Sequence, residues 1–110
     1  MTLNEYQQKA LETAVYPREF SIIYPTLGLS GEAGEVADKV KKVIRGDKGL
    51  SFENEETCKA IALEIGDVLW YVASLANDLG YTLEEICEMN YAKLKSRQQR
   101  NMLGGSGDNR

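Results

Sequence analysis

The chain has 110 residues, of which 43% are hydrophobic and 27% are charged, and this composition is typical of one soluble globular domain with a modest core. The formal charge of −4 argues against a general nucleic-acid-binding protein, which would usually be basic, but it allows a small anionic substrate held through a metal. The chain has no histidine, and this excludes histidine triads, zinc sites with histidine ligands and imidazole general bases.

Two features predict a cytoplasmic protein without a membrane segment. Cys58 and Cys87 stand apart without a CxxC motif and fit free thiols in a reducing cytosol, and the N-terminus MTLNEYQQ is too polar for a signal peptide. The stretch Ala60–Asn77 is largely apolar, but two acids near its middle and polar flanks argue against a transmembrane helix.

The first half of the chain predicts two helices. Apolar residues at helical spacing indicate a helix over 4–15, which Pro17 ends. The segment 16–25 then forms a connection that is too rich in Tyr, Phe and Ile for an ordinary exposed loop, so it is expected to pack over the core or line a pocket. A second helix follows over 25–45, with Gly46 as its C-terminal cap.

Three glycines, Gly28, Gly31 and Gly34, lie in the first half of this second helix, where each lowers helix propensity by about 1 kcal/mol. A glycine inside a helix usually has a packing reason. We therefore expect another backbone or a ligand to approach the helix closely here.

The second half of the chain predicts two more helices. One runs over 53–79 and ends before Gly80, and the next opens with Thr82 as N-cap and Glu85 three residues later, which is a capping box. No segment alternates as a strand would. The sequence therefore predicts an all-α four-helix bundle over residues 1–100, followed by a flexible C-terminal tail over 101–110.

Two pairs of acids, each three residues apart, mark the second and third helices. Glu64 and Asp67 lie in the apolar stretch 60–77, where two like charges need a cation or a raised pKa. Glu32 and Glu35 form the other pair, and both pairs lie to the same side of their helix's apolar stripe. If the two helices pack antiparallel, the four carboxylates can meet.

Four carboxylates without Cys or His nearby favour Mg²⁺, or Mn²⁺, over zinc. The alternative to metal binding is that the ExxE motif forms an ordinary solvated helix face, in which Glu35 pairs with Lys39 at i+4. A solvated face explains Glu64 and Asp67 less well, because the residues around them in the sequence are largely apolar.

The third helix is apolar almost all round, since Leu63 and Trp70 lie away from its main stripe. A second subunit would bury the extra face, and symmetric association is the default for such a subunit contact. The alternative is that the first helix covers Trp70.

Basic residues gather late in the chain. Lys93 and Arg97 share one face of the fourth helix at i and i+4, where they suit either the negative end of the helix dipole or a phosphate clamp. The absence of a Gly-x-x-x-x-Gly-Lys loop excludes a P-loop nucleotide site.

The ordered set of motifs resembles the MazG-like nucleoside triphosphate pyrophosphohydrolases of the all-α NTP pyrophosphatase superfamily. These motifs are ExxE at Glu32–Glu35, ExxD at Glu64–Asp67 and the late Asn90-x-x-Lys93-x-x-x-Arg97. The similarity extends to LGLSGEAGEVADKVKK and EIGDVLWYVASLANDLG, and it covers roughly residues 3 to 100.

The resemblance implies a Mg²⁺-dependent enzyme that cleaves a nucleoside triphosphate between the α- and β-phosphates, for nucleotide-pool control or housecleaning. It also implies a homodimer or a homotetramer made of two dimers, with no nucleic-acid polymer and no membrane as partner. It implies that Glu32, Glu35, Glu64 and Asp67 hold the metal and that Lys93, Arg97, Tyr71 and Asn90 bind the substrate. Some members carry a further Glu directly before the ExxE, where this chain has Gly31, so Glu35 or Glu32 is left to activate the water.

Two other functions remain open at this stage. A non-enzymatic helical interaction module would use the acids in ordinary salt bridges. A di-iron carboxylate bundle would typically need Glu-x-x-His pairs, and the chain has no histidine to supply them.

Overall fold

The protein is described by a computed structural model covering residues 1–101, 103–105 and 107, and these residues form helices and no strands. This confirms the all-α class, whereas the flexible tail predicted over 101–110 falls in part on residues outside the described set. The elements in chain order are α1 (Leu3–Leu11), the 3₁₀ helix η1 (Arg18–Phe20), α2 (Ile23–Arg45), α3 (Glu55–Asp78) and α4 (Leu83–Gln99).

The helix ends follow the local signals of the sequence. Thr82 and Glu85 form the predicted capping box, in which each side chain accepts a hydrogen bond from the other residue's backbone N–H. Gly46 ends α2 with φ 84°, and Gly80 follows α3 with φ 88°, both in the left-handed region that glycine adopts readily. Asn54 caps α3 by accepting from the N–H groups of its first turn.

The first helix is shorter than the predicted 4–15, because it ends at Leu11. The N–H groups of Glu12, Thr13 and Ala14 bond carbonyls three residues back rather than four, so the helix tightens into a turn before Pro17 is reached. The connection to α2 therefore starts earlier than the proline alone indicates.

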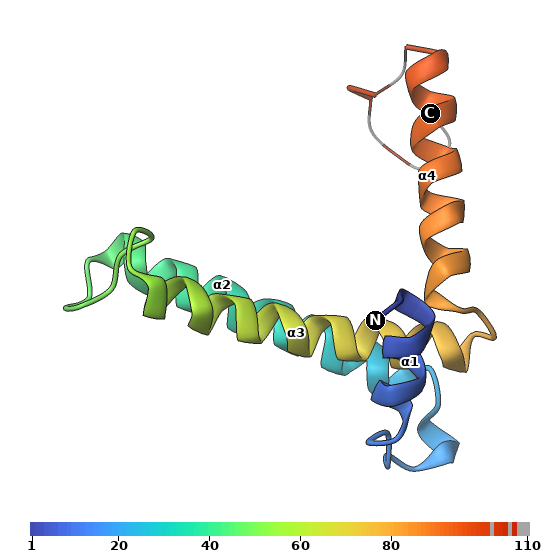
Figure 1. The fold of residues 1–110 in the computed structure, drawn as a ribbon, viewed down its shortest axis with the longest axis horizontal. Coiled ribbons are helices and arrows are strands. Elements are labelled where there is room, and N and C mark those ends of the chain that lie inside the picture. The colour runs from blue at the N-terminus through green and yellow to red at the C-terminus, as the bar shows by residue number, and fades with distance from the viewer. Residues whose placement is uncertain (102, 106, 108–110) are drawn as a thin grey trace.

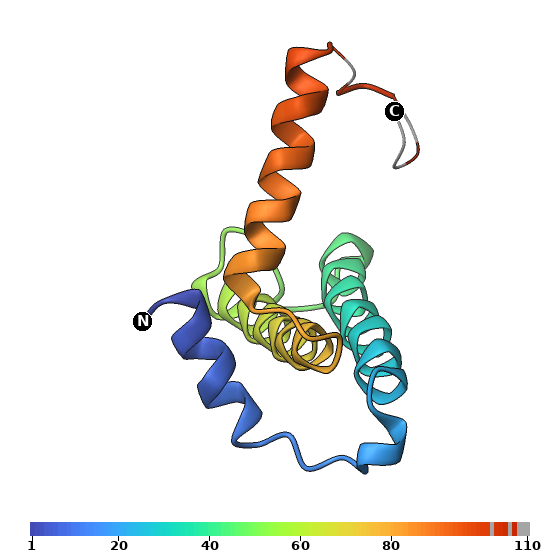
Figure 2. The same ribbon diagram turned by 90° about the vertical axis from the view of Figure 1, so that its right-hand side faces the viewer.

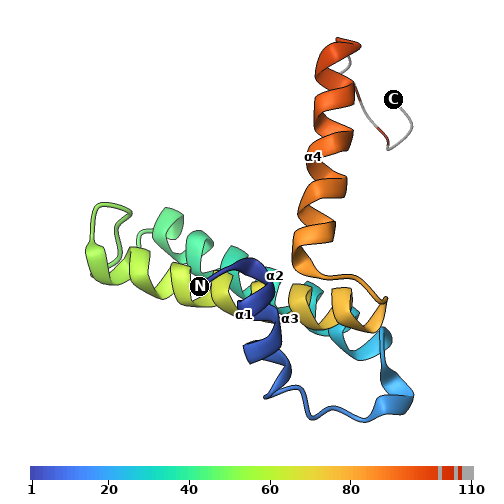
Figure 3. The same ribbon diagram turned by 45° about the vertical axis from the view of Figure 1, so that its right-hand side comes forward.

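Helices α2 and α3 lie side by side and antiparallel, and they form the long horizontal pair in Figure 1. Figure 2 looks along this pair and shows α1 beside α3, with the connection from α1 passing beneath to reach α2. Helix α4 leaves the end of α3 and projects away from the pair (Figure 3), touching α1 and α3 only near its start. The four α-helices therefore do not close into a bundle within one chain.

The core is small and lies where α1, the end of α3 and the start of α4 meet. Its buried members are chiefly small residues, which let the helices approach closely: Ala10, Ala73, Ala76 and Leu83, with Tyr6, Trp70, Val72 and Ile86 packed against them. Trp70 donates its indole N–H to the Ala10 carbonyl and the Thr13 hydroxyl, so α1 covers it, as the alternative interpretation held.

Gln7 is a buried polar side chain that joins three elements. It is 2% exposed, and its amide nitrogen donates to the carbonyls of Ala73 and Tyr81 while its oxygen accepts from the Leu83 N–H. All its main hydrogen-bonding needs are met within the core, so it fixes α1 against the turn between α3 and α4.

One chain leaves much of its apolar surface uncovered. The radius of gyration is 16.9 Å, whereas a compact chain of this length has about 13 Å. On α3, Leu63, which lies away from the main apolar stripe, is 64% exposed, and Ile65, which belongs to that stripe, is 53% exposed. Within the described residues, no helix combines the length and the apolar character that a membrane crossing requires.

Candidate functional site

Three carboxylates converge between α2 and α3. Glu32 on α2 and Glu64 and Asp67 on α3 each present an oxygen, and these oxygens all lie within 4.8 Å of one another. The antiparallel pairing brings the acid-bearing flanks of the two helices together, as the angular positions of the acids predict. Glu35 is exposed and does not belong to this group, so its role as a ligand stays a prediction. We call Glu32, Glu64 and Asp67 the acidic group.

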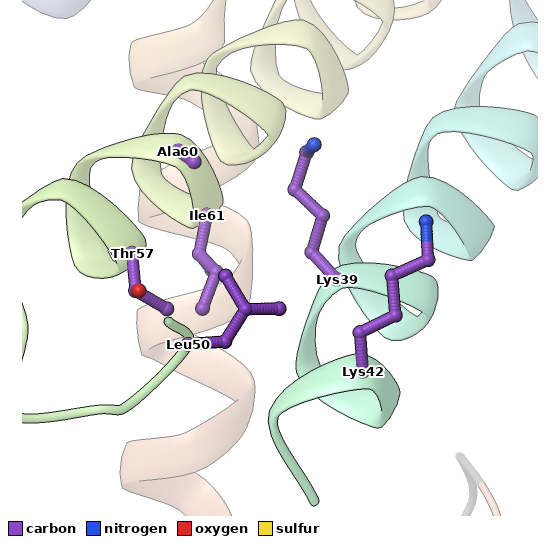
Figure 4. Close-up of a pocket in the computed structure, with 6 residues that line it drawn as sticks. All are labelled: Lys39, Lys42, Leu50, Thr57, Ala60 and Ile61. Atoms are coloured by element: carbon purple, nitrogen blue, oxygen red, sulfur yellow. The ribbon is translucent and has the colours of Figure 1, made fainter. Parts of the chain in front are cut away.

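The positive charge that the apolar stretch 60–77 lacks comes from α2. The Lys39 ammonium lies 3.6 Å from a Glu64 carboxylate oxygen, so within the described part of the chain this lysine pairs across the helices rather than with Glu35. Figure 4 shows Lys39 extending between α2 and α3, where with Lys42 it also lines a pocket of about 100 Å³. One ammonium offsets only part of the charge of three carboxylates.

The pKa of the Glu32 carboxyl is raised in this environment. Loss of hydration raises the pKa of this carboxyl, and the negative charges of Asp67, Glu64 and Glu35 raise it further. A divalent cation would reverse this effect by favouring the ionised form. The donors are all carboxylate oxygens, which fits a hard ion such as Mg²⁺ or Mn²⁺ and not a site built for zinc.

An open hollow of about 350 Å³ lies directly beside the acidic group. Glu32, Asp67, Trp70 and Tyr71 line it, so two acids and two aromatic rings share one space. Burial raises the pKa of the Tyr71 hydroxyl, and the neighbouring Tyr24 and the charges of Glu32 and Asp67 add to this. The Tyr71 hydroxyl is therefore protonated at neutral pH, and it forms a hydrogen bond with the Tyr24 side chain.

Tyr71 lies against the backbone of α2 at Gly28. A Cβ atom built on Gly28 would lie 2.1 Å from the Tyr71 ring, which is far inside van der Waals contact. The close approach expected at the helix-two glycines therefore occurs at Gly28. Nothing among the described residues lies within 4 Å of the same position on Gly31 or Gly34.

Tyr71 belongs to a row of rings that we call the aromatic wall, made of Tyr16, Tyr24, Tyr71 and Trp70. Tyr16 and Tyr24 stack with centroids 4.9 Å apart and 14° between their planes, and Tyr24 and Tyr71 are 6.4 Å apart. Trp70 meets Tyr71 edge to face at 4.9 Å. The connection 16–25 thus contributes Tyr16 and Tyr24 to this row, and Tyr24 packs against Tyr71, which lines the hollow.

The connection is held by Asp78, the last residue of α3, whose side chain is 2% exposed. Its Oδ2 accepts from the Tyr16 hydroxyl at 2.7 Å and from the Ile22 N–H at 2.9 Å, and Arg18 lies 3.7 Å from its Oδ1. Ile22 has φ 71° and ψ −52°, a conformation that costs a β-branched residue about 1–3 kcal/mol.

Sequence reasoning did not identify Asp78 or Tyr6 as part of this region. Asp78 follows a polar Asn at a helix end, which is an ordinary place for an acid. Tyr6 reads as part of the apolar stripe of α1, yet the charge of Asp67 contributes, after burial, to raising the pKa of its hydroxyl. No periodic pattern distinguishes either residue.

The predicted phosphate-binding residues lie on α4, away from the acidic group in a single chain. Asn90 and Lys93 line a separate hollow of about 300 Å³ with Ile86 and Met89. Arg97 lies one turn further along and is 4% exposed. Of the predicted substrate-binding residues, only Tyr71 lines the same hollow as the acids.

Comparison with known proteins gives one family. The profile of the MazG nucleotide pyrophosphohydrolase domain matches residues 24–102. The chain is also 44% identical over 117 residues to the Gene 37 protein of Mycobacterium phage L5, with all of both chains covered. No solved structure matches. Since the domain match spans most of the chain, including the acidic group and the α4 residues, the protein belongs to the MazG nucleotide pyrophosphohydrolase family.

Proposed function

We propose that the protein is a Mg²⁺-dependent nucleoside triphosphate pyrophosphohydrolase that releases a nucleoside monophosphate and pyrophosphate, in nucleotide-pool control or housecleaning. The observation that carries the proposal is the acidic group beside a hollow lined by Trp70 and Tyr71. Carboxylates suit the metal that accompanies a triphosphate, and aromatic rings suit a base. The MazG domain match supports the same chemistry.

The proposal assigns metal binding and water activation to four carboxylates. Glu32, Glu64 and Asp67 hold the ion, with Glu35 as a further ligand from the next turn of α2. When bound, Mg²⁺ neutralises the triphosphate and lowers the pKa of a coordinated water. Glu35 or Glu32 accepts the proton of the attacking water, since Gly31 offers no side chain for this task. Attack at the α-phosphorus breaks its bond to the bridging oxygen, which leaves with pyrophosphate.

The substrate panel tests the reaction itself. The protein is incubated with each common ribo- and deoxyribonucleoside triphosphate and Mg²⁺ in ¹⁸O-labelled water, and the products are resolved by chromatography and mass spectrometry. We expect monophosphate and pyrophosphate, with the label in the monophosphate because the α-phosphorus is attacked. Diphosphate and orthophosphate, label in pyrophosphate, or no turnover would contradict the proposal.

Completion of the site requires a second copy of the chain. Lys93 and Arg97 are proposed to bind the phosphates and Asn90 to lie in the substrate pocket, yet in one chain α4 projects away from the α2 and α3 pair. The exposed apolar residues of α3 and the large radius of gyration support a homodimer, or a homotetramer built from two dimers.

The mass in solution tests this assembly. Sedimentation equilibrium is expected to give two or four times the mass of one chain, because a lone chain exposes too much apolar surface. Leu63→Glu, which places a charge on an exposed apolar position of α3, is expected to shift the distribution toward single chains and to lower activity with it. A wild-type protein that remains monomeric while hydrolysing nucleotides would contradict a shared site.

A further inference from the structure

Asp78 holds two points of the connection between α1 and α2, which contains Tyr16 and leads directly into Tyr24 on the first turn of α2. Its buried carboxylate accepts hydrogen bonds from the Tyr16 hydroxyl and from the backbone N–H of Ile22, the last residue before α2. Arg18 approaches the second oxygen at 3.7 Å and also lies 4.5 Å from the centroid of the Tyr16 ring. One side chain at the end of α3 therefore determines the path of a connection that begins after α1.

Ile22 has an unfavourable backbone conformation, which its hydrogen bond to Asp78 helps to maintain. At φ 71° a β-branched residue is strained, and such a conformation persists only where its surroundings over-determine it. The Ile22 N–H donates to Asp78, and the Ile22 carbonyl accepts from the Thr26 hydroxyl at 2.6 Å. Strain held by a buried charged group is typical of a segment whose position matters to a site.

The held segment leads directly to the hollow. Tyr16, fixed through its hydroxyl, stacks on Tyr24, and Tyr24 lies against Tyr71, which shares the hollow with Glu32 and Asp67. Gly28 supports Tyr71 from the side of α2. A shift of the connection would thus move the Tyr24 and Tyr71 rings without touching the acidic group.

We propose that Asp78 is a positioning residue for substrate binding, which holds the aromatic wall at the geometry that receives the nucleoside part of the substrate. The inference rests on the proposed function, because it assigns the wall to the base and sugar and the acidic group to the metal and phosphates. Asp78 therefore controls the affinity for nucleosides and leaves metal binding unchanged.

The test compares Asp78→Ala with Tyr16→Phe, which removes only the hydroxyl, and with Asp78→Asn, which keeps one oxygen acceptor. Asp47→Ala is the matched control, because Asp47 likewise accepts two hydrogen bonds, both from Arg45, but lies in the turn after α2. For each protein we measure kcat and KM for the best nucleotide, the inhibition constant of inorganic tripolyphosphate, Mn²⁺ affinity and the near-ultraviolet circular dichroism of the rings.

We expect Asp78→Ala to raise KM by about 10-fold with kcat within about 3-fold, since one buried charged acceptor is lost. Tyr16→Phe should raise KM by about 3-fold, and Asp78→Asn should recover most of the loss. The tyrosine dichroism should change in step with KM, whereas tripolyphosphate inhibition and Mn²⁺ affinity should match those of the Asp47→Ala control.

Two results would overturn the inference. One is unchanged KM and dichroism in folded Asp78→Asn, Tyr16→Phe and Asp78→Ala proteins. The other is an equal loss of nucleotide, tripolyphosphate and Mn²⁺ binding, which would show a general structural role. Failure of the proposed function is distinct, since it appears as absence of turnover in the wild-type protein, while the dichroism still reports whether Asp78 holds the wall.

Discussion

Asp67→Asn is expected to lower kcat/KM for nucleoside triphosphate hydrolysis by about 100-fold or more, the loss that removal of one preorganised charge-stabilising group causes. Asp67 is the member of the acidic group that also lines the hollow, so its charge acts on both the ion and the substrate. Its oxygen lies within 4.8 Å of those of Glu32 and Glu64, and the amide would leave the acidic group with two charges instead of three. Steady-state kinetics at saturating Mg²⁺ measures the loss.

The same substitution separates a metal ligand from a structural acid. In the absence of metal, Asp67→Asn removes a charge from a repelling group, so the melting temperature should stay the same or rise. Saturating Mg²⁺ should raise the melting temperature of the wild-type protein but not that of the variant. Glu64→Gln should behave likewise in activity, although it also loses the Lys39 ion pair.

Glu53→Gln is the matched control for the acidic group. Glu53 is exposed in the turn before α3, and its replacement removes one negative charge from the same chain without touching the hollow. We expect wild-type kinetics and a wild-type response to Mg²⁺. If Asp67→Asn and Glu53→Gln had the same activity, the acidic group would not be the metal site.

Gly28→Ala is expected to give the second large effect, a loss of about 1–2 kcal/mol in the free energy of unfolding together with a higher KM. The new methyl would lie 2.1 to 2.5 Å from three atoms of the Tyr71 ring, so the ring must move. Tyr24 and Trp70 already pack against that ring, and overpacking of this kind costs about 1–3 kcal/mol, more than the helix propensity that alanine restores. Urea denaturation and nucleotide kinetics measure the two effects.

Trp70 makes the movement visible, because it is the chain's single tryptophan and meets the Tyr71 ring edge to face at 4.9 Å. Its fluorescence should change in Gly28→Ala. Gly31→Ala is the matched control on the same helix, since no described atom lies within 4 Å of the new methyl. We expect Gly31→Ala to stabilise the protein by about 0.5–1 kcal/mol with unchanged fluorescence. Equal stability and fluorescence of the two variants would show that Gly28 has no packing role.

For the acidic group, helical periodicity predicts which faces of α2 and α3 carry the acids, but not which of the acids meet. The i, i+3 spacing of Glu64 and Asp67, and the matching position of Glu32 on α2, predict that these side chains meet if the two helices pair antiparallel. The structure pairs them so. Periodicity does not determine which turn of α2 lies opposite the acids of α3. For that reason it did not predict that Glu32 would join the acidic group while Glu35 stays exposed.

The helical class, the capping box at Thr82 and Glu85 and the acid-bearing faces could all be predicted from the sequence, because each depends on contacts within a few residues along the chain. Three contacts became known only from the packed fold: Lys39 pairs with Glu64, α1 covers Trp70, and Asp78 holds the connection to the aromatic wall. These contacts join residues that are 25 to 62 positions apart. Their geometry depends on how whole helices pack, and no local pattern encodes that packing.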